Sequence, residues 1–191
     1  LLLIGRSDEA IAAMKRAVEL DPLTPLWISD LTWQYWSLGR YQEAMDATQK
    51  ALELNPNFNQ ALCWLGFLYS EKGQYAEAVA AHQKLSTVSP KWKLALARTY
   101  AQAGRQDEAR KMLAECLAGE PKPAGAWEGW FLGEVYAALG EKDEAFHWLD
   151  EAVKERMTFI PWMRQNPAYA PLRSDPRFEE LVRRMKLPEL K

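Results

Sequence analysis

Residues 39–56 have the sequence GRYQEAMDATQKALELNP, which begins with a glycine, has a Glu-Ala pair four residues later and ends with a proline. The same spacing of glycine and Glu-Ala recurs along the chain, at intervals of 34, 34, 31 and 36 residues between the glycines. The five sites are Gly5, Gly39, Gly73, Gly104 and Gly140, followed by Glu9-Ala10, Glu43-Ala44, Glu77-Ala78, Glu108-Ala109 and Glu144-Ala145. A period near 34 predicts an array of helix pairs.

The residues within one unit favour two helices that pack closely. Leu31 and Tyr35 are four residues apart, and Ala44 and Ala51 are seven apart, so each set shares one helical face. Gly39 follows the first helix, at a place where a left-handed backbone conformation is readily adopted only by glycine. We therefore predict an antiparallel helix pair that is repeated along the chain.

These units resemble the tetratricopeptide repeat. The fullest match is residues 59–92, where the motif residues are Leu62, Leu65, Gly66, Tyr69, Gly73, Ala78 and Pro90. The resemblance implies an all-α superhelical solenoid of helix-turn-helix units. It also implies a scaffold rather than an enzyme, whose partners are determined by groove residues outside the motif.

The predicted organisation is five repeat units and a cap. Residues 1–24 are expected to form a partial repeat with only the second helix, and residues 91–125 a repeat with a shortened first helix and a long connector. Full repeats are predicted at 25–58, 59–90 and 126–158, and residues 159–191 form the C-terminal cap. Asp175 is expected to cap a final helix that begins at Pro176.

The cap helix carries an apolar stripe and a basic face. The stripe is expected to cover the open end of the solenoid. It consists of Phe178, Leu181, Val182 and Met185. The basic residues of the cap are interpreted as a solvated face or as a contact for an acidic neighbouring domain; they are Arg164, Arg173, Arg177, Arg183, Arg184 and Lys186.

Charge and hydropathy exclude several classes of function. The chain has 24 basic and 26 acidic residues, a balance that does not favour nucleic-acid binding. No run of about 20 apolar residues is present, so no membrane insertion is expected. Cys63 and Cys116 fall in different repeats, which favours buried thiols over a disulfide. The absence of an initiator methionine predicts a fragment of a longer protein, for which a cytoplasmic location is expected.

The sequence contains no convincing active site, metal site or cofactor site. His82 falls at a buried motif position, which predicts a hydrogen-bonded core histidine. His147 has Asp143, Asp150 and Glu151 within one helical turn, but a second histidine or a cysteine is missing, which disfavours a metal site. Phosphate-loop and hydrolase motifs are also missing, and we expect no enzymatic activity and no cofactor.

A partner-binding groove is the remaining functional prediction. The family's carboxylate clamp needs Lys and Asn at two inner positions, and here only Arg98 could serve it. The inner positions are instead rich in aromatic residues, which favours a peptide or helix of a protein partner. The predicted groove residues are Trp33, Trp36, Cys63, Phe67, Leu94, Arg98, Trp127, Trp130 and Glu134.

Several alternatives remain open at this stage. The aromatic residues could be packing residues, or the chain's own tail, residues 159–162, could cover the groove. The chain could also be a homodimerisation module that associates through Leu1–Leu3. The stretch PLRSDPRFEELVRRMKLP resembles the C-terminal end of tetratricopeptide regions in bacterial multidomain regulators, which implies a sensing or regulatory part of such a protein.

Overall fold

The computed structural model describes residues 6–86, 90–119, 126–155, 163–164 and 166–184, and all regular structure in these ranges is helical. The helices are α1 (Ser7–Leu20), α2 (Pro25–Ser37), α3 (Tyr41–Leu54), α4 (Asn59–Glu71), α5 (Tyr75–Ser86), α6 (Pro90–Gln102), α7 (Gln106–Ala118), α8 (Ala126–Leu139), α9 (Lys142–Lys154), the 3-10 helix η3 (Pro167–Leu172) and α10 (Pro176–Arg184). The predicted all-α class is confirmed. Among the described helices, none is long and apolar enough to cross a membrane.

The chain divides into two compact units, and the division falls within α5, between Ala81 and His82. Unit 1 contains the described residues up to Ala81, and unit 2 contains the described residues from His82 onward. In a repeat array each pair of helices packs mainly on its neighbours, so one chain can form separate compact bodies.

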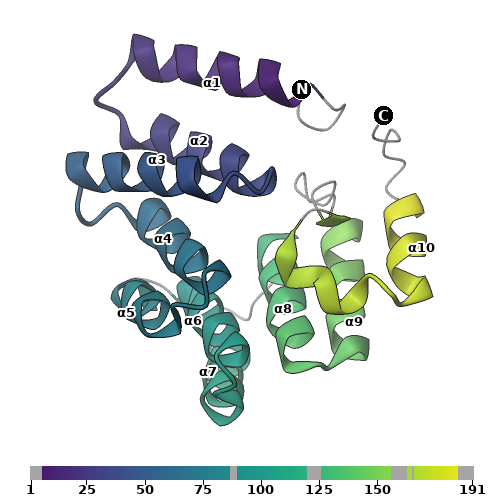
Figure 1. Ribbon diagram of the computed structural model, residues 1–191. Coiled ribbons are helices and arrows are strands. Elements are labelled where there is room, and N and C mark those ends of the chain that lie inside the picture. Colours follow the sequence, from purple (N-terminus) through teal and green to yellow (C-terminus); the bar gives the residue numbers. More distant parts are fainter. Residues whose placement is uncertain (1–5, 87–89, 120–125, 156–162, 165, 185–191) are drawn as a thin grey trace. The chain divides into compact units, whose positions relative to one another are not determined.

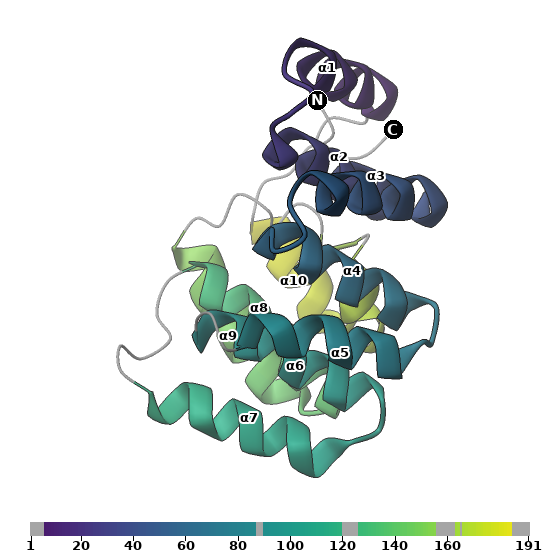
Figure 2. The same cartoon turned by 90° about the vertical axis from the view of Figure 1, so that its left-hand side faces the viewer.

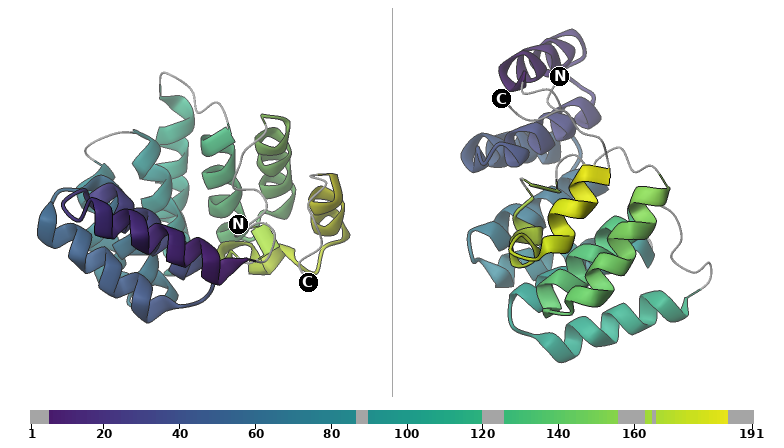
Figure 3. Two further views of the ribbon diagram at one scale, coloured as in Figure 1. Left: turned by 90° about the horizontal axis from the view of Figure 1, so that it is seen from above. Right: turned by 90° about the vertical axis from the view of Figure 1, so that its right-hand side faces the viewer.

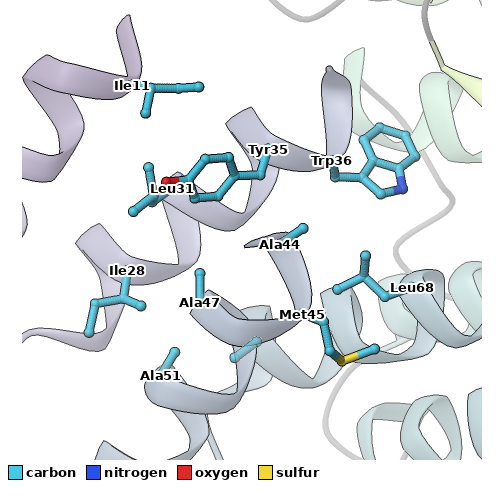
Figure 4. Close-up of a cluster of buried hydrophobic side chains, with 11 residues drawn as sticks. Ile11, Ile28, Leu31, Tyr35, Trp36, Ala44, Met45, Ala47, Ala51 and Leu68 are labelled. Atoms are coloured by element: carbon cyan, nitrogen blue, oxygen red, sulfur yellow. The ribbon is translucent and has the colours of Figure 1, made fainter. Parts of the chain in front are cut away.

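In unit 1, α2 packs on both α1 and α3, and α4 contacts α2 and α3 (Figure 1). Figure 4 shows the apolar core, in which Ile28, Leu31 and Tyr35 of α2 face the small side chains of Ala44 and Ala51 on α3. Both alanines are fully buried. Small residues at these places allow the two helices to approach closely, as the sequence pattern predicts.

In unit 2, α6 pairs with α7 and α8 pairs with α9, and the first helices of the two pairs, α6 and α8, also contact each other (Figure 2). The C-terminal segment lies on the second pair, with η3 against α8 and α10 against α9 (Figure 3). The first and second helices of each pair therefore have different neighbours, and the first helices carry the predicted site residues.

Four of the five repeat glycines end the first helix of a pair in a left-handed conformation. Gly39, Gly73, Gly104 and Gly140 have φ values of 71°, 73°, 76° and 79°. Space is open around each of them, so steric crowding does not explain the glycine. The backbone conformation does, because other residues adopt positive φ only at a cost. The prediction is confirmed for these four, and Gly5 lies outside the described residues.

An arginine after two of these glycines joins the helices of its pair, a feature that the sequence analysis missed. Arg105 donates to Glu108 one turn into α7, with 2.5 Å between Nε and Oε2, and its guanidinium lies 4.5 Å from the ring centre of Tyr100 on α6. Arg40 repeats the arrangement with Glu43 and Tyr35. Hydrogen bonding to the arginine lowers the pKa of the Glu108 carboxyl.

The predicted cap helix is confirmed at its start. α10 begins at Pro176, and the Asp175 carboxylate accepts a hydrogen bond from the backbone N–H of Arg177 at 3.0 Å. Side-chain and backbone hydrogen bonds from Arg177 lower the pKa of Asp175 to about 2. Phe178, Leu181 and Val182 are buried as predicted, whereas Met185 lies outside the described residues.

Two arginines of the cap's basic face form ion pairs with α9. Arg177 and Arg184 of α10 donate to Asp143 and Asp150 of α9, at 2.6 and 2.7 Å. The Arg177 guanidinium also stacks over Phe146, 4.4 Å from the ring centre. These arginines therefore contact α9 at the surface, in addition to facing solvent.

We predict that Gly133→Ala destabilises unit 2 by about 1–3 kcal/mol, because a Cβ must be fitted into a packed contact. A Cβ at Gly133 would lie 2.8 Å from Cγ and Cδ2 of Leu149 on α9. Urea unfolding followed by circular dichroism measures the change. Gly119→Ala is the matched control, since its Cβ would come no nearer than 3.4 Å to the neighbouring carbonyl oxygens of α7. Equal stability of the two variants would contradict the close α8–α9 contact.

Candidate functional site

The two histidines have the environments of structural residues. His82 is fully buried, and its Nδ1 lies 2.8 Å from the Thr99 hydroxyl of α6, which confirms the predicted core histidine. His147 is exposed on α9. Its neighbours Asp143 and Asp150 are bonded to arginines of the cap. Within the described ranges no group of three or more metal-ligating side chains is found.

The two cysteines are buried thiols, as predicted. Burial is the main cause that raises the pKa of Cys116 to about 11. A thiol in this environment stays protonated near neutral pH and is a poor nucleophile. The surroundings of Cys116 therefore favour a packing role.

Two first helices of unit 1, α2 and α4, form what we call the aromatic surface, defined by Trp33, Trp36, Cys63, Trp64 and Phe67. Trp36 and Trp64 have ring centres 5.6 Å apart, and Trp64 and Phe67 are 5.9 Å apart in an edge-to-face arrangement. The structure thus links two predicted site residues, Trp36 and Phe67, through Trp64. Mutual contacts of this kind stabilise aromatic clusters beyond their buried area.

Helices α2 and α4 carry buried polar atoms that have no hydrogen-bond partner among the described residues. In the described part of the chain, the buried indole N–H groups of Trp36 and Trp64 and the hydroxyl of Ser29 lack a partner. Buried polar groups in proteins are nearly always hydrogen-bonded, so each exception calls for an explanation. An acceptor supplied by a bound molecule would satisfy these donors.

Most of the side chains predicted to line the groove are buried, whereas residues that line an open groove would be exposed to solvent. Trp33 is partly buried against the core of unit 1, and Trp127 is 52% exposed. The other predicted residues are buried, namely Trp36, Cys63, Phe67, Leu94, Arg98, Trp130 and Glu134. In unit 1, the large rings on α2 and α4 cover one another. In unit 2, the C-terminal segment contributes to the cover, as described next.

A buried polar network joins α6, α8 and the C-terminal segment. Arg98 Nη1 lies 3.1 Å from Glu134 Oε2, and both side chains are almost completely buried. The other carboxylate oxygen of Glu134 accepts a hydrogen bond of 2.6 Å from the Asn166 side-chain amide. Arg98, the one predicted candidate for a carboxylate clamp, is therefore paired with Glu134 and is not open to a partner's carboxylate.

Tyr169 of η3 covers Trp130. The rings are in edge-to-face contact with centres 5.1 Å apart, and the Tyr169 hydroxyl donates to the Trp130 carbonyl at 2.9 Å. Tyr169 is fully buried, and this burial is the main reason that its pKa lies well above the ordinary value, with the Glu134 charge adding to it. The predicted cover by residues 159–162 lies outside the described residues, but the next part of the tail does occupy this place.

Trp127 and Phe131 form a second aromatic pair on α8, with ring centres 6.3 Å apart and nearly parallel planes. Phe131, Asn166 and Tyr169 were missed by the sequence analysis, and Trp64 was interpreted as a packing residue. A signal existed for Asn166, because an asparagine before proline is typical of a helix start, and its Oδ1 does accept a hydrogen bond from Ala168 N–H at 3.0 Å. No sequence pattern near Asn166 indicates that its side chain contacts Glu134.

We predict that Glu134→Ala lowers the free energy of unfolding by about 3–5 kcal/mol, because it leaves the buried Arg98 guanidinium without its carboxylate. Urea unfolding followed by tryptophan fluorescence gives the value. The matched control is Glu115→Ala, which removes a half-exposed partner of Lys93 at 3.2 Å and should cost less than about 1 kcal/mol. A small effect of Glu134→Ala would show that the network is solvated.

Comparisons with known proteins identify the repeat. Models of the tetratricopeptide repeat match residues 34–73, residues 90–132, and residues 1–22 with 60–91. The search of curated proteins gives no match.

Solved structures have the same fold at low sequence identity. TTC0263, a thermophilic TPR protein of Thermus thermophilus, is 22% identical over 86% of this chain and 91% of its own, with a TM-score of 0.62. A tetratricopeptide repeat protein of Parabacteroides merdae is 17% identical over 95% of this chain and 72% of its own, with a TM-score of 0.63. YrrB, a TPR protein with an unusual peptide-binding site, is 18% identical over 91% of this chain and 90% of its own, with a TM-score of 0.50. The chain is therefore built of tetratricopeptide repeats.

Proposed function

We propose that this chain is a protein-interaction scaffold that binds a peptide or helix of a partner on the aromatic surface of α2 and α4. The observation that carries the proposal is the pair of buried indole N–H donors, on Trp36 and Trp64, that lack a partner among the described residues. Trp33 and Trp64 are partly exposed, so they give a partner access to this surface.

The energetics favour a partner that supplies hydrogen-bond acceptors. A buried donor left without an acceptor costs about 1–3 kcal/mol, and this cost disappears when an acceptor is provided. The two indole N–H groups are buried, so the backbone carbonyls of a peptide reach them when a covering ring moves aside, while its apolar side chains lie on the partly exposed Trp33 and Trp64. Tryptophan residues with an apolar body and a polar N–H are frequent anchors of protein interfaces for this reason.

The wider context of the proposal comes from the resemblance and the comparisons. Scaffolds of this repeat act through their partners, and the structurally similar YrrB has a peptide-binding site. We propose that the chain acts in the cytoplasm as the sensing or regulatory part of a larger bacterial protein, without enzymatic activity of its own. Its partner is a protein or peptide rather than a nucleic acid.

We predict that Trp33→Ala lowers partner capture at least tenfold and leaves the helical content unchanged, because Trp33 is partly exposed and lies at the edge of the core. Pull-down from a bacterial lysate with immobilised protein, followed by mass spectrometry, measures the capture. The control is Leu23→Ser, which changes a 77% exposed apolar residue in the turn between α1 and α2. Proteins retained equally by both variants would contradict a site on the aromatic surface.

Self-association is the second candidate function, and a different observation favours it. Large apolar side chains of unit 1 are exposed around the helix ends and turns; they are Leu20, Leu23, Leu26, Trp27 and Leu54. Exposed apolar patches often mark interaction sites. The contact predicted from the sequence, Leu1–Leu3, lies outside the described residues.

If the chain is a homodimerisation module, we expect light scattering to show a dimer at micromolar concentration. Leu23→Ser should then raise the dimer dissociation constant at least tenfold, because it places a polar group in an apolar contact. Trp33→Ala is the matched control and should leave the dimer intact. A wild-type chain that stays monomeric would exclude this second function.

A further inference from the structure

The segment of residues 166–172, which contains η3, contacts α8 in the way that a bound peptide contacts a receptor. Its Asn166 amide donates to the buried Glu134 carboxylate, and its Tyr169 hydroxyl donates to the Trp130 carbonyl. Trp130 and Glu134 are two of the residues that the repeat pattern assigns to partner binding. The segment therefore occupies predicted ligand positions with side chains that make specific polar contacts.

These contacts differ in kind from those of the cap helix. α10 is held on α9 by exposed ion pairs and by its apolar stripe, which suits the cover of a solenoid end. Asn166 and Tyr169 instead form buried hydrogen bonds with an ion pair and with a helix backbone. A cover for an apolar end would need only apolar residues, so the polar contacts need another explanation.

We propose that the first-helix face of unit 2, formed by α6 and α8, is a peptide-binding site that is filled by the chain's own segment of residues 166–172. This inference rests on the proposed function as a peptide-binding scaffold. It adds a site on α6 and α8 to the aromatic surface of α2 and α4, and it names the chemistry of the peptide that binds there. The site accepts a turn of the type Asn-Pro-x-Tyr. A partner that carries such a turn binds by displacing the internal segment.

The three defined residues of the turn each contribute to binding on α8. The Asn166 Oδ1 accepts from Ala168 N–H at 3.0 Å, which fixes the turn and leaves the Nδ2 group to donate to Glu134. Pro167 restricts the backbone at the start of the turn. The Tyr169 ring fills the space over Trp130. An aspartate in place of Asn166 would instead place a carboxylate against the Glu134 carboxylate, which is unfavourable.

The test uses the full chain with its own segment weakened. A fluorescent peptide of residues 163–184 is titrated against the wild-type chain and against the chain carrying Asn166→Ala and Tyr169→Ala, with binding read by anisotropy. We expect the peptide to bind the double variant at least tenfold more tightly than the wild type, whose site is filled. Equal binding to the two chains, or no binding to a double variant with unchanged helical content, would overturn the proposal.

A matched pair of peptides tests the recognition chemistry. The peptide with Asn166→Asp differs by one polar group, and we expect it to bind the double variant at least tenfold more weakly than the unchanged peptide. Equal affinity would show that the cap binds only through its apolar stripe and would refute the site. If the double variant unfolds, Tyr169→Phe replaces it, with binding at least threefold tighter than to the wild type as the expected result.

Two further controls separate this proposal from its alternatives. Adding Trp33→Ala to the double variant should leave its affinity for the peptide unchanged. The peptide titration therefore remains valid even if the pull-down shows that the aromatic surface binds no partner. Light scattering of the wild type at rising concentration tests whether the segment is exchanged between two copies of the chain. A dimer that Tyr169→Phe dissociates would show that a second copy supplies the segment, and it would refute occupation within one chain.

Discussion

The close approach of the two helices of each pair is the constraint on which the rest of the structure depends. The alanines of four of the five repeated Glu-Ala pairs, Ala44, Ala78, Ala109 and Ala145, are fully buried. The approach is close at α8 and α9, since a Cβ added at Gly129 would lie 2.9 Å from the Trp148 carbonyl oxygen. Interiors are packed so tightly that even one added methyl group is felt, and small residues are therefore required at every pair.

The sequence predicts the features of the fold that depend on neighbouring residues. The left-handed glycines, the start of α10 and the buried alanines each follow from a few residues in one helix or turn. The relation between Glu134 and Asn166 does not, because 32 residues separate them and no local rule connects a carboxylate to a distant amide. The pattern placed Trp130 and Glu134 on the first-helix face as a set, but it could not show that Tyr169 covers Trp130. The contact of Trp64 with a ring on α2 likewise joins two different repeats, so no pattern within one repeat indicates it.

The buried network and the surface ion pairs hold the C-terminal segment in different ways. Surface pairs such as Arg184 with Asp150 contribute little, because water screens them and long side chains lose freedom. The Arg98–Glu134 pair is shielded from water, so the loss of either partner would leave the other buried charge without this ion pair. Asn166 completes the hydrogen bonding of Glu134, and this ties the position of the segment to the integrity of the pair. We therefore attribute the position of the C-terminal segment on α8 to the hydrogen bonds of Asn166 and η3. We attribute the stabilisation that the cap provides to the apolar stripe of α10.

The two first-helix faces of the chain differ in how their polar atoms are satisfied. On α8, the Glu134 carboxylate and the Trp130 carbonyl receive hydrogen bonds from Asn166 and Tyr169. On α2 and α4, the indole N–H groups of Trp36 and Trp64 have no acceptor within the described residues. On α8 the chain itself thus satisfies two acceptors, whereas the unpartnered indole N–H groups on α2 and α4 are donors; the Gln34 side-chain carbonyl of α2 is a buried acceptor that also lacks a partner in the described part of the chain. A ligand for the aromatic surface must bring acceptors, whereas a ligand for the α8 face must bring donors. Because of this difference in polarity, one peptide is not expected to satisfy both faces equally well, and selectivity between them follows from hydrogen bonding rather than from apolar area.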